Sequence, residues 1–90
     1  MKVKNYLVFF LLFLLGCNNF EREYFKSGML KAEYEIKNEN RNGVGKRFYE
    51  NGELYCVNHW KDGVLDGNAI YYYQNGQVKE EYKYINGTAS

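Results

Sequence analysis

The seven residues from Phe48 to Leu54 read FYENGEL. The same pattern stands one unit later, as YYQNGQV at 72–78, and one unit earlier, as YFKSGML at 24–30. Aromatic residues, a turn glycine and an apolar residue thus recur at one 24-residue period without a gap; the turn glycines are Gly28, Gly52 and Gly76. A fixed period of this length is the mark of stacked supersecondary units. The sequence therefore predicts three repeats.

Each repeat contains a hairpin signal. Asn-Gly between apolar runs favours a type I′ turn, which needs a positive φ at both central positions. Asn51-Gly52 and Asn75-Gly76 fit this pattern, and Ser27-Gly28 is a weaker version. We expect an all-β fold, a meandering antiparallel sheet of about six short strands. The expected strands are 21–26, 29–37, 44–50, 53–61, 68–74 and 77–85.

Alternation along these strands sorts the side chains onto two faces. One face collects the apolar columns of all three repeats: Phe25, Tyr49, Tyr73; Leu30, Leu54, Val78; Ala32, Cys56, Glu80; Tyr34, Asn58, Tyr82; and Ile36, Trp60, Tyr84. The other face is polar in the outer repeats and apolar in the middle one. The candidate interaction patch on it is Phe48, Tyr55, Val57 and Tyr72. Exposed apolar patches often mark interaction sites. The alternative is that the sheet twists and these rings cover one another.

The N-terminal segment carries a targeting signal. Lys2 and Lys4 precede YLVFFLLFLL at 6–15, an uncharged run too short to span a bilayer as a helix and typical of a signal peptide. Leu14-Leu15-Gly16-Cys17 follows and resembles the lipobox of bacterial lipoproteins. The resemblance implies a short helical signal peptide at 1–16, cleavage before Cys17, and acylation of the Cys17 thiol. Leu15 departs from the commoner smaller residue.

Composition and residue inventory exclude several classes. The formal charge is +1, with 12 basic and 11 acidic residues, which argues against nucleic acid as a partner. His59 is the single histidine, and the expected register turns it away from Cys56. We therefore expect no catalytic residues, no metal site, no cofactor and no enzyme activity. Cys56 is expected to be a small core residue.

The repeat unit Y/F-x-x-N/S-G-x-L/V, with its later aromatic and Gly-rich spacers, resembles the MORN repeat. The nearest likeness is the variant in small bacterial lipoproteins and in antitoxins of the YwqK type. The resemblance implies a lipidated tether at 17–21 and a repeat domain at 22–90, with repeats at about 22–45, 46–69 and 70–90. Glu39 departs from the pattern, because Gly63 and Gly87 stand at its equivalent positions.

Together these features predict a bacterial lipoprotein held in the cell envelope by acylated Cys17, on the outer membrane if the host has two. Its expected role is a non-catalytic protein-interaction module, with an immunity or antitoxin-like role and a cognate toxin as one version. The alternative is a structural envelope protein that contacts lipid headgroups or cell wall. Because exposed edge strands pair with other chains, the final hairpin is also a candidate edge for dimerisation.

Overall fold

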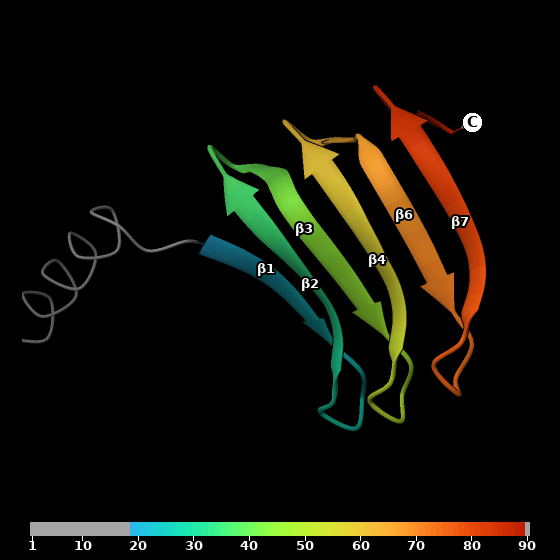
Figure 1. Ribbon diagram of the computed structural model, residues 1–90. Helices are drawn as coiled ribbons and strands as arrows, with labels where there is room; N and C mark the ends of the chain where they lie inside the picture. The colour runs from blue at the N-terminus through green and yellow to red at the C-terminus, as the bar shows by residue number, and fades with distance from the viewer. Residues whose placement is uncertain (1–18, 90) are drawn as a thin grey trace, which may run out of the picture.

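The computed structural model describes residues 19–89, which form one antiparallel sheet (Figure 1). Six long strands meander in chain order, as expected, and two strands of two residues each extend the spacers. The strands are β1 (Asn19–Tyr24), β2 (Leu30–Lys37), β3 (Asn40–Phe48), β4 (Leu54–Lys61), β5 (Val64–Leu65), β6 (Gly67–Tyr72), β7 (Val78–Ile85) and β8 (Thr88–Ala89). The expected helical signal peptide at 1–16 lies outside the described residues. Within 19–89 no helix is long and apolar enough to cross a membrane.

The hairpins at the Asn-Gly positions use a different turn from the expected one. Gly52 N donates to the Tyr49 carbonyl over 3.0 Å, and Tyr49 N donates to the Glu53 carbonyl over 2.8 Å. Only Gly52 has a positive φ, 95°, so Glu50 and Asn51 form the turn and Gly52 follows it. This is a three-residue loop with a glycine bulge. The prediction of a type I′ turn at Asn51-Gly52 and Asn75-Gly76 was wrong.

The type I′ turns lie instead at the spacers. Asn38 and Glu39 both have positive φ, and so do the pairs Asp62-Gly63 and Asn86-Gly87. Each pair joins two directly paired strand residues, such as Lys61 and Val64. Successive spacers are also linked, because Gly63 N donates to the Arg41 carbonyl and Gly87 N to the Leu65 carbonyl, both over 2.8 Å. The same bond therefore recurs at the repeat period.

A second irregularity recurs beside each hairpin. Phe48 pairs with Leu54 but Arg47 pairs with Cys56, so Tyr55 is an extra residue in β4. The first and third repeats show the same shift, with Lys31 and Lys79 as the extra residues. Such a β-bulge changes which face the neighbouring side chains occupy. Beyond the bulge the pairing is the expected one.

The sheet is a single layer, about 17 Å thick along its shortest axis. The buried side chains lie on the central strands; they are Ala32, Tyr34, Cys56, Asn58 and Ala69. Cys56 is a buried free thiol, as predicted. The strand β7 is exposed at every residue except Tyr84, which is half-buried. The described chain therefore has a small core in the middle of the sheet and little at its edges.

Candidate interaction surface

The two faces of the sheet have different chemistry. Residues directly opposite one another in an antiparallel pair share a face, and neighbours in a strand alternate. The register thus places Tyr34, Cys56 and Tyr71 on one face, here called the cluster face. It places Val57 and Ile70 on the other, here called the row face.

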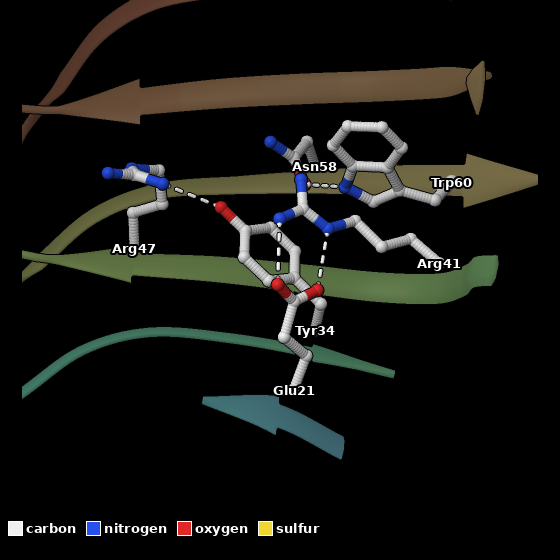
Figure 2. Close-up of polar contacts among 6 residues, drawn as sticks. All are labelled: Glu21, Tyr34, Arg41, Arg47, Asn58 and Trp60. Carbon is white, nitrogen blue, oxygen red and sulfur yellow. Dashed lines mark hydrogen bonds and ion pairs between the residues drawn. The ribbon is translucent and has the colours of Figure 1, made fainter. Parts of the chain in front are cut away.

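The cluster face is organised around Arg41 (Figure 2). Its guanidinium carbon lies 3.7 Å from the ring centroid of Tyr34 and 5.0 Å from that of Trp60. Two of its nitrogens donate to the Glu21 carboxylate, over 2.9 and 3.2 Å. These hydrogen bonds lower the pKa of Glu21 and raise that of Arg41. The pair therefore stabilises the fold above the ordinary pKa of a glutamate, and this contribution is lost as pH falls through the lowered pKa.

Polar groups beneath Arg41 all have partners. Arg47 donates to the Tyr34 hydroxyl over 2.6 Å, and Trp60 Nε1 donates to Asn58 Oδ1 over 2.8 Å. Asn58 Nδ2 in turn lies 3.7 Å from the Cys56 sulfur, its acceptor. Among the described residues no buried side-chain nitrogen or oxygen lacks a partner. The cluster consequently joins the strands β1, β2, β3 and β4 through side-chain contacts.

A chain of tyrosine rings continues the cluster face toward β7. Tyr55 makes edge contacts with Tyr49 and Tyr71, at centroid separations of 5.0 and 5.7 Å, and Tyr71 contacts Tyr82 at 6.0 Å. Burial, with the neighbouring Cys56, raises the pKa of Tyr71 to about 12. Tyr55 was predicted on the opposite face. As the bulge residue it turns onto the cluster face instead, where its ring is covered by other rings.

The equivalent residues confirm this change of face. Lys31 lies 5.6 Å above the Phe25 ring, and Lys79 lies 5.8 Å above the Tyr73 ring. Each is the bulge residue of its repeat, as Tyr55 is. All three bulges therefore direct their extra side chain over the aromatic residue that precedes the turn.

The row face carries a continuous apolar row along the hairpin end of the sheet. Tyr24 pairs with Leu30, Phe48 with Leu54, and Tyr72 with Val78, and the register places all six on this face. Val57 and Ile70 lie next to the row in the middle of the sheet. Tyr24 and Val78, at its two ends, are 59% and 52% exposed, and the four residues between them are half-buried. No element among residues 19–89 packs over this row.

The structure thus brings together three of the four residues of the predicted patch: Phe48, Val57 and Tyr72. The prediction for Leu30, Leu54 and Val78 was wrong, because the bulge moves this column from the core face to the row face. Tyr24 and Ile70 were also missed as members of the patch. The signal that could have revealed the change of face of Leu30, Leu54 and Val78 is Ser27, which suits the observed turn better than a type I′ turn.

The other candidate residues fall as follows. Gly28, Gly52 and Gly76 all follow their turns with positive φ, at 97°, 95° and 93°. Cys17, the predicted lipidation site, lies outside the described residues. His59 and Cys56 lie on opposite faces, and His59 Nδ1 donates to the Asn68 carbonyl over 2.9 Å. Within residues 19–89 no group of histidine, cysteine, aspartate and glutamate side chains could hold a metal ion.

Comparison with known proteins finds one family model that matches the chain, at two segments. Residues 41–62 and 65–86 each match the family model of the MORN repeat variant. The two matched segments have the same length, and the second begins one repeat period after the first, in agreement with the sequence pattern and the pairing register. No curated protein and no solved structure matches the chain.

Proposed function

We propose that this chain, a MORN-repeat protein, is a lipid-anchored module that binds another protein and catalyses no reaction. The observation that carries the proposal is the apolar row on the row face. Apolar side chains run across six strands of a single-layer sheet, from Tyr24 to Val78, with no second layer over them among the described residues. Aromatic residues of this kind are enriched where proteins meet.

The charges beside the row favour a protein over a polyanion. Across the row face, Arg22, Glu33 and Lys46 alternate in sign, and Glu81 stands on the far side of Val57 and Ile70. Cleavage before Cys17 would remove two basic residues and no acidic residue, which leaves a side-chain charge of −1. A nucleic acid or an anionic lipid surface attracts a strongly basic face. A mixed face of this kind complements the mixed surface of a protein.

The lipobox-like sequence and the start of β1 at Asn19 support the proposed anchor. Acylation of Cys17 would leave Asn18 alone between the lipid and the first strand residue, Asn19. Asn19 pairs with Ile36, near the spacer turns, so those turns would face the bilayer and the hairpin tips would point away. The row lies at the hairpin end, where a partner protein can reach it.

Capture of a partner by the full-length protein in detergent tests the row. A photo-crosslinking residue at position 72 should join one protein, and Phe48→Ala should abolish that product. The matched control is Tyr73→Ala, because Tyr73 is the next residue, is 49% exposed and lies on the opposite face. A crosslinked protein retained equally by Phe48→Ala, or lost equally with Tyr73→Ala, would contradict the proposed surface.

A toxin is the partner class that the likeness to antitoxin repeats suggests. Co-expression with the product of a neighbouring gene tests this version. The parent chain should protect cells from that product, and the Phe48→Ala chain should not. Protection by both chains would remove the row from the mechanism, and absence of protection would remove the immunity role.

Mass spectrometry of the mature N-terminus tests the anchor separately. We expect a chain that begins at Cys17 and carries acyl groups, and a Cys17→Ser chain that is released from the membrane fraction. An unmodified Cys17, or a start upstream of it, would refute the anchor without touching the protein-binding row.

A further inference from the structure

We propose that the protein binds a second copy of itself head to tail, with the β7 edge of one copy paired to the β1 edge of the next. The sheet and its apolar row would then continue from one molecule into another. The proposal rests on the register between repeats, on the state of the two edges, and on the charges that the register brings together.

The pairing between repeats follows one rule. Ala32 pairs with Arg47 and Glu33 with Lys46; one repeat later, Cys56 pairs with Tyr71 and Val57 with Ile70. Each repeat therefore offers its second long strand to the first long strand of the next repeat in the same register.

β1 is the strand that the same rule would place beside β7 if the sheet continued into a second copy. Arg22 and Glu23 in β1 stand one repeat before Lys46 and Arg47. If β1 of a second copy took the next place beside β7, the rule would set Arg22 of that copy opposite Glu81. Glu23 of that copy would stand opposite Glu80. Among residues 19–89, β1 ends the sheet order on one side, and on the other β7 is paired outward to β8 only at Tyr84 and Ile85.

Contacts on the row face would favour this pairing. Arg22 opposite Glu81 repeats, with acid and base at the equivalent positions, the cross-strand pairing of Glu33 with Lys46 inside the chain. Val78 and Tyr24, the two exposed ends of the apolar row, would become neighbours and cover each other. Opposite charges and apolar pairs across strands both stabilise a sheet.

The cluster face limits the affinity. Glu80 and Glu23 would be like charges directly opposite each other, where the chain itself has Ala32 against Arg47. Head-to-tail contacts that do not close into a ring can add further copies without limit. The repulsion between Glu80 and Glu23 would weaken each contact, and we therefore expect weak and reversible association. This repulsion also predicts that Glu23→Arg, which copies Arg47, strengthens self-association.

Two symmetric pairings of β7 edges, centred on Glu81 and on Tyr82, fit less well. The pairing centred on Glu81 would set Glu81 against Glu81 and Lys79 against Lys83. The pairing centred on Tyr82 would need the edge at Tyr84, which β8 already occupies. The head-to-tail arrangement uses the edge from Val78 to Tyr82, beside β8 and not in its place.

Disulfide crosslinking of the full-length chain in detergent distinguishes these arrangements. Chains carrying Arg22→Cys and chains carrying Glu81→Cys are mixed and oxidised, with the parent chain as the background for Cys17 and Cys56. We expect a product joining positions 22 and 81, since opposite residues in a sheet lie within disulfide range. Chains with Asn51→Cys at a hairpin tip, mixed with Glu81→Cys chains, are the control and should give none. A product joining 81 to 81, or no product from chains with parent-like circular dichroism, would overturn the proposal.

Sedimentation gives a second measurement that does not depend on the cysteine variants. Glu81→Arg should weaken self-association several-fold, since it replaces an opposite-charge pair with a like-charge pair. Glu50→Arg, at a hairpin tip, is the matched control and should behave as the parent. Glu23→Arg should strengthen association. Equal sedimentation of all four chains would overturn the proposal.

Discussion

Gly45 leaves the space in which the side chains of Tyr34, Asn58 and Trp60 pack. A Cβ at this position would lie 2.8 Å from both Trp60 Nε1 and Tyr34 Cδ1, and closer still to Asn58 Oδ1. We therefore expect Gly45→Ala to lower the free energy of unfolding by about 1–3 kcal/mol, the usual cost of overpacking. Urea denaturation measures this cost. Trp60 is the only tryptophan, so its fluorescence in the native state should also change.

Gly28→Ala separates this steric effect from a backbone effect. Nothing lies within 4 Å of a Cβ at position 28, but its φ of 97° disfavours any side chain. The substitution should therefore cost stability and leave the native fluorescence of Trp60 unchanged. If Gly45→Ala also leaves that fluorescence unchanged, the packing described for Gly45 is wrong.

Glu39 occupies a backbone conformation that suits glycine. Its φ is 68°, and Gly63 and Gly87 stand at the equivalent positions of the other spacers. A left-handed residue with a side chain costs about 1–2 kcal/mol, partly offset by the entropy that a glycine loses on folding. Glu39→Gly should therefore raise the free energy of unfolding by about 0.5–1 kcal/mol, measured by thermal denaturation. The reverse exchange, Gly63→Glu, should lower it, and the opposite pair of signs would contradict this account.

The hairpin turns depend on a side-chain hydrogen bond, which makes the turn type testable. Asn51 Oδ1 accepts from Glu53 N over 2.9 Å, Asn75 Oδ1 accepts from Gln77 N over 2.9 Å, and Ser27 Oγ accepts from Met29 N over 3.3 Å. Asn51→Ser should therefore keep the parent stability within about 0.5 kcal/mol, whereas Asn51→Ala should lose about 0.5–1.5 kcal/mol. In a type I′ turn both would be destabilising, because both lose the tolerance of asparagine for positive φ. Denaturation of the two variants therefore distinguishes the two turns.

The same turn shows how far the sequence determines the strands. The period, the six long strands, their antiparallel order and the pairing beyond the bulges were predictable from the spacing of glycines and aromatic residues, whereas the two-residue strands β5 and β8 were not predicted. The turn type was not, because Asn-Gly satisfies both a type I′ turn and a three-residue loop with a glycine bulge. The bulge at Tyr55 was hidden for a similar reason, since one extra residue leaves the repeat period unchanged while it reverses the face of Leu54. The error in turn type thus became an error in face for a whole column.

The candidate surface was predictable to the extent that alternation survives the bulge. Phe48, Val57 and Tyr72 lie on unbroken alternating segments, and their shared face was correctly predicted. The contact of Arg41 with Glu21 was not predictable, because the two residues lie 20 positions apart, on β3 and β1, and the order of the strands brings them together. The repeat period shows which residues occupy equivalent positions. Side-chain contacts between different positions become visible only in the folded sheet.

A single-layer sheet whose buried residues all lie on its central strands should not unfold uniformly. Stacked repeats contact only their neighbours, so stability behaves as a sum of repeat and interface terms. β7 carries no buried side chain, whereas β2, β4 and β6 carry buried side chains. We expect amide hydrogen exchange by mass spectrometry to be slowest in β2 to β4, faster in β6, and fastest in β7. Gly45→Ala should accelerate exchange in β2 to β4 more than in β7, because its cost falls on the central cluster. Equal protection of β4 and β7 would mean that the sheet opens as one unit, and the description of a central core with weak edges would then be wrong.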